Sequence, residues 1–226
     1  MKVKKMRVQL PIRSFEYSGE GQKSRHGPLL PDHPRMVCCG PSNAGKTDFL
    51  LNLLIHKNGI KFKNVYLFCK TLDQPKYRFL ERAINQVKGV SFYGFKDGIL
   101  SPDEVEDHSV VIFDDINSED PAVIQDYYSR GRHKSLCCLL VCQTYSSVKK
   151  QLIRDNCNLI VLFKMDLVNL KHVYSDHVSC DMSFNKLHEL CVECWKVPYG
   201  TFIINKECEK SNGRYRRGID EYIKLE

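Results

Sequence analysis

The stretch Val37-Cys-Cys-Gly40-Pro-Ser-Asn-Ala-Gly45-Lys46-Thr47 decides the fold of this chain. It begins as an apolar run typical of a strand, and a helix-like apolar run follows from Lys46. The octet from Gly40 to Thr47 has the form G-x-x-x-x-G-K-[ST], whose glycines permit a tight backbone path with N–H groups converging on phosphate oxygens. The N-terminus of the following helix adds its dipole to the same anion site. The sequence therefore predicts a phosphate-binding loop, or P-loop, between a strand and a helix.

This loop is expected to bind ATP and Mg²⁺, the two predicted cofactors. Lys46 is expected to bridge the β- and γ-phosphates, and the hydroxyl of Thr47 is expected to ligate Mg²⁺. The predicted nucleotide-binding set is the whole octet: Gly40, Pro41, Ser42, Asn43, Ala44, Gly45, Lys46 and Thr47.

A second element, residues 109–116, is an apolar run that leads into two acids. A buried parallel strand would deliver these carboxylates to the carboxyl edge of the sheet, where ligands of open α/β sheets bind. Asp114 fits the Mg²⁺-linked position, and Asp115 fits the position that orients and deprotonates the attacking water. Glu119 competes with Asp115 for the role of base. For Glu119 we favour a place in the acidic first turn of a helix entered at Pro121.

Outward from these motifs, short apolar runs alternate with stretches of helix length, which is the pattern of βαβ units on a mainly parallel sheet. The predicted strands are 35–39, 64–69, 90–93, 109–113, 136–142, 159–163 and 200–204. The predicted helices are 46–57, 75–87, 121–130, 147–155, 166–175 and 183–194. At 226 residues the chain suits one α/β domain, which we divide into a basic arm and linker (1–34), a P-loop core (35–207) and a short basic tail (208–226).

Composition limits the setting in which the protein works. Lys and Arg number 34 against 27 Asp and Glu, a formal charge of +7, which permits work near phosphates without requiring it. The 11 cysteines are an odd number and most lie inside apolar runs, which indicates buried thiols in a reducing compartment. No apolar h-region follows the charged N-terminus, and no run approaches roughly 18 apolar residues. We therefore expect an intracellular protein without a membrane span.

The strand predicted after Asp115 helps to choose among the classes of P-loop protein. In simple nucleotide switches and kinases the acidic strand often neighbours the P-loop strand, whereas motor and helicase ATPases insert another strand that carries a polar sensor. Residues 136–142 are continuously apolar and stop at Gln143, which would place an amide at the phosphate edge. Gln143 is a candidate sensor of the γ-phosphate or of the attacking water. A polar residue that merely closes a strand fits the same pattern.

Three arginines are candidates for a finger that acts on a neighbouring subunit. In a ring ATPase, an arginine near the nucleotide edge reaches the neighbour's γ-phosphate and neutralises transition-state charge. We place Arg132 first and Arg130 and Arg154 next, because basic clusters flank the strand predicted at 136–142. A solvated helix end or a DNA-contact patch is the alternative for each cluster.

Together these motifs resemble the genome-packaging ATPases of poxviruses, related large DNA viruses and Maverick/Polinton elements, within the FtsK-HerA superfamily. The resemblance runs from about residue 33 to residue 204. The matching features are His33-Pro34-Arg35 before the P-loop, Phe113-Asp114-Asp115, Gly131-Arg132-His133-Lys134, Gln143, and Ile153-Arg154-Asp155-Asn156. The P-loop is generic, whereas the ordered set with Gly-Arg-His and the glutamine is more specific.

The resemblance implies a RecA-like core of the ASCE type, in which a sensor strand lies between the P-loop strand and the acidic strand. It implies a homo-oligomeric ring that hydrolyses ATP at subunit boundaries and moves double-stranded DNA into a preformed capsid. DNA of any sequence and a capsid or vertex protein are then the expected partners. The expected location is the site of virion assembly in the host cytoplasm or nucleus, or the virion itself. In this resemblance Asp114 and Asp115 are the acidic pair, and Gln143 is the sensor.

Two features depart from the pattern of the cellular pumps FtsK and HerA. Those pumps commonly carry Asp-Glu where this chain has Asp114-Asp115, so the predicted base is shorter. The chain also lacks a separate DNA-gripping domain, so DNA contacts are expected from pore loops or the basic ends. The candidates are Lys149, Lys150, Arg214, Arg216 and Arg217, each of which also suits a solvated surface.

Two further patterns have ordinary explanations beside the functional ones. Four residues have spacings that permit a tetrahedral zinc site, namely His188, Cys191, Cys194 and Cys208. Two of these cysteines, Cys191 and Cys194, also fit the buried face of an amphipathic helix together with Leu187 and Leu190, and we favour this explanation. Trp195 and Pro198-Tyr199 are expected to cover the core before the last strand.

The sequence therefore predicts an Mg²⁺-dependent ATPase motor that packages viral or virus-like DNA. A nucleoside or polynucleotide kinase shares the P-loop, but it would need an acceptor pocket and an Arg-rich lid, and it gives Gln143 no obvious role. The non-enzymatic alternative is a nucleotide-gated scaffold that docks on a capsid or membrane protein through its N-terminal arm.

Overall fold

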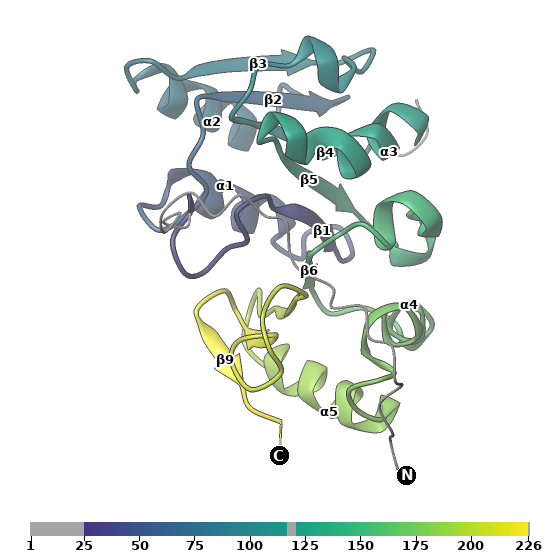
Figure 1. Cartoon of the computed structure of the whole chain (residues 1–226). Helices are drawn as coiled ribbons and strands as arrows, with labels where there is room; N and C mark the ends of the chain where they lie inside the picture. Colours follow the sequence, from purple (N-terminus) through teal and green to yellow (C-terminus); the bar gives the residue numbers. More distant parts are fainter. Residues whose placement is uncertain (1–24, 117–120, 226) are drawn as a thin grey trace, which may run out of the picture.

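The computed structural model describes residues 25–116 and 121–225. These residues form a nine-stranded sheet in the order β3-β2-β4-β5-β1-β6-β7-β8-β9, with β3 at one end and β9 at the other (Figure 1). The strands are β1 (Arg35–Cys39), β2 (Asn64–Cys69), β3 (Ser91–Phe95), β4 (Ser109–Asp114), β5 (Cys137–Cys142), β6 (Leu159–Leu162), β7 (Phe202–Asn205), β8 (Tyr215–Arg217) and β9 (Glu221–Ile223). The fold is the single α/β domain with a mainly parallel sheet that the sequence predicts.

The strands from β3 to β6 along the sheet pair in parallel, and β7, β8 and β9 extend the sheet with antiparallel pairs. β5 lies between β1 and β4 and pairs with both. The strand expected between the P-loop strand and the acidic strand is therefore present. All residues of β5 are buried, which explains its continuous apolar sequence, because helices cover a parallel sheet on both faces.

Helices form a layer on each face of the sheet. They are α1 (Lys46–Ile55), α2 (Pro75–Asn85), α3 (Pro121–Arg130), α4 (Leu167–Val173) and α5 (Phe184–Cys194). Successive residues of a strand point to opposite faces. Met36 therefore packs in the core layer beneath α1 and α2, while Val37 packs in the layer beneath α3, α4 and α5. Among the described helices, none is both long enough and apolar enough to cross a membrane.

Two predicted helices differ from the structure. The helix predicted at 147–155 is wrong, since the chain makes a 3₁₀ turn at Tyr145–Ser147 and a π-helical turn at Lys150–Arg154. The helix predicted at 166–175 is α-helical only in α4 and continues as a π-helical turn at Tyr174–Val178. An ion pair of 2.7 Å between Arg154 and Asp176 joins the two π-helical turns. This contact between distant residues is not visible in local periodicity.

The residues after 207 do not form a tail, so that part of the predicted division is wrong. β8 and β9 extend the sheet antiparallel to β7, and Tyr215 is fully buried. Arg216 is also buried, and its guanidinium donates to the carbonyl oxygens of Leu29 at 2.7 Å and Ile219 at 3.0 Å. Arg216 therefore stabilises the fold and is excluded as a DNA contact.

The described part of the predicted linker packs on the core. His26 is buried, and its Nδ1 accepts the backbone N–H of Lys61 at 2.9 Å. Burial lowers the pKa of His26 to about 4, so the ring is neutral at physiological pH. Leu30 joins the core layer beneath α1. The basic arm predicted for the first residues of the chain lies outside the described residues.

Candidate active site

The ends of β1, β4 and β5 bring the predicted site residues to one edge of the sheet. The register aligns Cys39 of β1 with Cys142 of β5, and Asp114 of β4 with Val141 of β5. The residues that follow these strands therefore lie side by side at the carboxyl edge, where ligands of open α/β sheets bind. Gly40 is joined directly to β5, because its N–H donates to the carbonyl of Cys142 at 3.2 Å.

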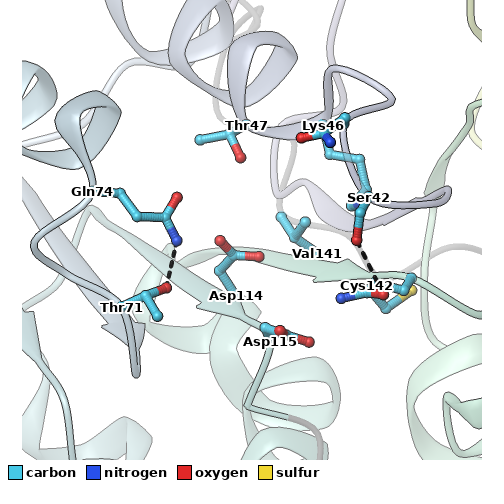
Figure 2. Close-up of a pocket in the computed structure, with 11 residues that line it drawn as sticks. Ser42, Lys46, Thr47, Thr71, Gln74, Asp114, Asp115, Val141 and Cys142 are labelled. Carbon is cyan, nitrogen blue, oxygen red and sulfur yellow. Dashed lines mark hydrogen bonds between the residues drawn. The ribbon is translucent and has the colours of Figure 1, made fainter.

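A cleft of about 250 Å³ opens at this edge (Figure 2). Its lining includes predicted residues from all three strand ends: Ser42, Asn43, Lys46, Thr47, Asp114, Asp115 and Gln143. Thr71 and Gln74, which follow β2, also line the cleft and were missed by the sequence interpretation. The cleft thus combines, in one place, the residue types that bind phosphate, ligate a metal and orient water.

The P-loop has the backbone conformation that its motif requires. Gly45 has a φ of 101°, which strongly favours glycine. A Cβ atom at Gly40 would lie 2.5 Å from the Cβ atom of Phe163, so only glycine fits there. The ammonium group of Lys46 donates to the carbonyl oxygens of Gly40 at 2.6 Å and Pro41 at 2.7 Å. These bonds hold the charge over the loop and beside the cleft.

The predicted metal ligands, Thr47 and Asp114, face each other across the cleft (Figure 2). Thr47 lies in the first turn of α1, and Asp114 ends β4. A hydroxyl and a carboxylate are hard oxygen ligands of the kind that Mg²⁺ binds together with phosphate oxygens and water. The residues therefore fit Mg²⁺, which would neutralise charge on the phosphates.

A buried tyrosine of α2, Tyr77, connects this pair. Its hydroxyl donates to Oδ2 of Asp114 and also interacts with the hydroxyl of Thr47. Burial, foremost, and the neighbouring Asp115 raise the pKa of Asp114, while Tyr77 and Lys46 oppose the rise. The sequence interpretation missed Tyr77. No sequence signal identified it, because its position follows from the pairing of β2, which precedes α2, with β4.

Asp115 lies at the exposed side of the cleft. Its φ of 56° is left-handed, a conformation that aspartate tolerates better than most residues. An exposed carboxylate next to a phosphate site is placed to accept a proton from water. The competing acid Glu119 falls outside the described residues, so the choice of base stays a prediction.

Gln143 follows β5 and reaches the P-loop. The hydroxyl of Ser42 donates to Oε1 of Gln143 at 3.4 Å. The thiol of Cys39 lies 3.7 Å from the backbone carbonyl of Gln143. The structure confirms that this amide lies at the phosphate edge, while its role as a sensor stays a prediction.

The three candidate arginines do not join this cleft. Arg130 ends α3 and Arg132 lies in the turn before β5, which places both at the amino edge of the parallel sheet. This edge is opposite the cleft, because α3 carries the chain back across the sheet. Arg130 pairs with Asp126 at 2.8 Å. Arg154 is buried in its ion pair with an aspartate of the same subunit, which does not suit a finger.

The zinc alternative has no support in the part of the chain that the structure describes. Within 25–116 and 121–225, no three His, Cys, Asp or Glu side chains form a group that could hold a metal ion. Leu187, Cys191 and Cys194 are the buried residues of α5, as the helix interpretation predicts. Cys208 instead accepts an N–H of Arg216 at 3.5 Å. The cysteines are free thiols, and most are buried, as predicted.

Comparison with known proteins gives matches only to solved structures, since no protein-family model and no curated protein sequence matches the chain. The genome packaging NTPase B204 from Sulfolobus turreted icosahedral virus 2, in complex with AMP, aligns with a TM-score of 0.56 and 13% identity over 86% of this chain and 100% of its own. Its complex with AMPPCP gives a TM-score of 0.56 and 14% identity over the same shares. B204, the DNA-packaging ATPase from Sulfolobus turreted icosahedral virus, gives a TM-score of 0.55 and 13% identity. At this identity the likeness concerns the fold: the chain has the α/β fold of viral genome-packaging P-loop NTPases.

Proposed function

We propose that this protein is an Mg²⁺-dependent ATPase that moves double-stranded DNA into a viral or virus-like capsid. The observation that carries the proposal is the meeting of the P-loop, Asp114-Asp115 and Gln143 around one cleft, with β5 inserted between β1 and β4. The fold shared with B204, a genome packaging NTPase solved with AMP, ATP-gammaS and AMPPCP, supports nucleotide chemistry at this cleft. The affiliation with the FtsK-HerA superfamily is part of the proposal.

Positioning and charge neutralisation would supply most of the catalysis. Lys46 would exchange its loop carbonyls for oxygens of the β- and γ-phosphates, and Thr47 and Asp114 would hold Mg²⁺. Gln143 would orient a water molecule in line with the γ-phosphate, and Asp115 would accept its proton. A bond then forms between the water oxygen and the γ-phosphorus as the bond to the bridging oxygen breaks, which releases ADP and phosphate.

A homo-oligomeric ring would complete the site with an arginine from the adjacent subunit. Arg132 is the candidate because its side chain is exposed, whereas Arg130 is engaged in an ion pair and Arg154 is buried. Such a ring would bring the amino edge of one subunit against the carboxyl edge of the next. The finger would then act at a boundary between subunits.

DNA would be held through its phosphates, without sequence preference and with strong salt dependence. Among the basic candidates, Arg214 and Arg217 are engaged in ion pairs, while Lys149 is exposed just beyond the loop that carries Gln143. Lys149 is therefore the first choice for a DNA contact. A capsid or vertex protein would anchor the ring at the site of virion assembly, in the host cytoplasm or nucleus.

The direct test measures ATP hydrolysis with and without double-stranded DNA. We expect DNA to stimulate ATP hydrolysis by the wild type. We expect the Lys46→Ala and Asp115→Asn variants to lose ATP hydrolysis. Hydrolysis that is indifferent to DNA and to both substitutions would contradict the proposal. Transfer of phosphate to an added nucleoside or DNA end would indicate a kinase. Tight ATP binding without turnover, even on DNA, would indicate a nucleotide-gated scaffold.

Mixed assemblies test the arginine separately. Lys46→Ala subunits retain Arg132, and Arg132→Ala subunits retain an intact P-loop. If the arginine acts across the boundary, mixing two inactive variants should restore part of the hydrolysis. Arg130→Ala is the matched control, since Arg130 lies on the same edge, and it should remain active alone. An active Arg132→Ala variant would exclude Arg132 as the finger.

A further inference from the structure

A tyrosine beside the P-loop has an unusual backbone conformation. Tyr199 is 70% exposed and has a φ of 60°, in the left-handed region that bulky residues rarely adopt. It lies in a turn in which the N–H of Gly200 donates to the carbonyl of Val197 at 3.0 Å. With Pro198 second and a positive φ third, the turn has the pattern of type II, whose third position prefers glycine or asparagine. Backbone preference therefore does not explain an aromatic side chain here.

The ring of Tyr199 packs against the P-loop itself. A Cβ atom at Gly45 would lie 2.7 Å from Cδ1 of Tyr199. The expectation that Tyr199 covers the core is wrong, because most of the residue is exposed. Trp195, in contrast, does pack on the core, and its Nε1–H donates to the carbonyl of Leu162 at 2.9 Å. The two aromatic residues before β7 thus have different environments: Trp195 is partly buried, whereas Tyr199 is largely exposed and lies against Gly45 of the P-loop.

Two clefts meet at Tyr199, and the first of them adjoins the phosphate cleft. The first, of about 540 Å³, shares Lys46 and Thr47 with the phosphate cleft and extends to Tyr199. The second, of about 500 Å³, is lined by Tyr199 together with Phe49 and Phe163. A triphosphate held by Lys46 and Thr47 would therefore direct the sugar and base of its nucleotide toward an aromatic surface.

We propose that Tyr199 is the platform on which the base of the bound nucleotide stacks. The inference rests on the proposed function, in which the P-loop binds ATP. The exposed face of the ring offers a base a flat, polarisable surface, and the tight turn orders the ring before binding. Stacking requires no base-specific hydrogen bonds, so the platform accepts any nucleobase and binds the larger purines better.

Calorimetric titration of the full-length protein, in the presence of Mg²⁺, tests the platform with two probes. AMPPCP carries a base and resists hydrolysis, whereas inorganic tripolyphosphate carries phosphates without a base. Tyr199→Ala should weaken AMPPCP binding about 10- to 100-fold and leave tripolyphosphate binding unchanged. Tyr199→Phe keeps the ring and should bind both probes as the wild type does.

Tyr199→Gly separates stacking from folding. Glycine adopts a positive φ without strain, so the melting temperature should equal or exceed that of the wild type. AMPPCP affinity should nevertheless fall as in the alanine variant. A melting temperature that falls together with the affinity would mean that the ring packs the fold, and it would overturn the inference.

Two further outcomes have distinct meanings. If Tyr199→Ala weakens both probes equally, or weakens neither, the platform is overturned while the phosphate site stands. A wild-type protein that binds neither probe would refute the proposed function, and the base platform with it. The Lys46→Ala variant should bind neither probe. This control shows that the titration measures binding at the P-loop.

Discussion

The two edges of the parallel sheet use polar side chains in opposite ways. At the amino edge they fasten the backbone of neighbouring segments. Asn158 accepts the N–H of Arg35 at 2.7 Å and donates to the carbonyl of His33 at 3.0 Å. Lys134 likewise donates to the carbonyl of Val105 at 2.6 Å. Because these side chains satisfy backbone groups, they contribute to stability.

At the carboxyl edge, polar side chains line a cleft. Asp115 and Gln143 are exposed, and Lys46 and Asp114 are partly exposed. Water can replace most of their hydrogen-bond partners, so these side chains contribute little to the stability of the fold. The difference teaches that the two edges are separable within one subunit: substitutions that line the cleft at the carboxyl edge should lower activity, and substitutions of the backbone-bonded side chains at the amino edge should lower stability.

Lys46→Ala should give the largest effect. In the proposed mechanism its ammonium group neutralises charge on the transferred phosphoryl group, so its loss should lower kcat for ATP hydrolysis about 10²- to 10³-fold, or about 3–4 kcal/mol. The melting temperature should not change. Lys134→Ala is the matched control at the amino edge, and it should melt earlier while keeping its kcat. A loss of stability in the first variant, or of activity in the second, breaks the comparison.

Gln143→Ala should give the next largest effect. If this amide orients the attacking water, as proposed, its removal should lower kcat about 100-fold, or about 2.7 kcal/mol, with little change in KM. Thr144→Ala is the control, because this exposed neighbour does not line the cleft. Single-turnover measurements of ATP hydrolysis compare the Gln143→Ala and Thr144→Ala variants. An unchanged kcat would mean that Gln143 only closes the strand.

Asn158→Ala tests the amino edge. The substitution leaves a partly buried backbone N–H and carbonyl without their side-chain partner, so the free energy of unfolding should fall by about 2 kcal/mol. Urea denaturation measures the loss, and kcat should stay at the wild-type value. Asn156→Ala is the control, since its side chain makes a hydrogen bond to the carbonyl of Leu152 at 2.9 Å at a more exposed position. Equal midpoints for the two variants would contradict the prediction.

Tyr77→Phe should give the smallest effect and sharpens the comparison inside the site. Removing the hydroxyl that orients Asp114 should raise the Mg²⁺ concentration for half-maximal hydrolysis about tenfold, or about 1.4 kcal/mol. At saturating Mg²⁺, kcat should recover. Tyr127→Phe is the control, because this buried hydroxyl donates to the carbonyl of Leu100 at 2.8 Å, away from the cleft. A Tyr77→Phe variant that only melts earlier would assign Tyr77 to the fold.

Motifs made of neighbouring residues were predictable from the sequence. The strand predicted at 35–39 is β1, and the helix predicted to begin at residue 46 is α1. The acidic pair could be assigned for the same reason, since a buried strand delivers its last residue to a known edge of the sheet. The glutamine could be placed there as well, but its contact with Ser42 required the order of the strands.

The features that could not be predicted depend on contacts between distant segments. Tyr77 reaches Asp114 across 37 positions of the chain, and Arg154 reaches Asp176 across 22. Charge patterns gave a wrong DNA-contact candidate for the same reason. Arg216 belongs to a basic run, but it is buried and donates to two backbone carbonyls. Whether an arginine is a surface charge or a buried donor depends on what packs against it.

By itself, the sequence determined the P-loop, the acidic strand end and the alternation of strands and helices, because backbone preference and apolar periodicity are properties of adjacent residues. The tertiary structure confirmed that β5 lies between β1 and β4, as the family resemblance implied. It alone decided that Tyr77 contacts Asp114 of the predicted metal-binding pair and that Tyr199 lies against Gly45. The physical reason is that strand order and helix placement follow from burying apolar surface over both faces of the whole sheet. No single segment contains that information.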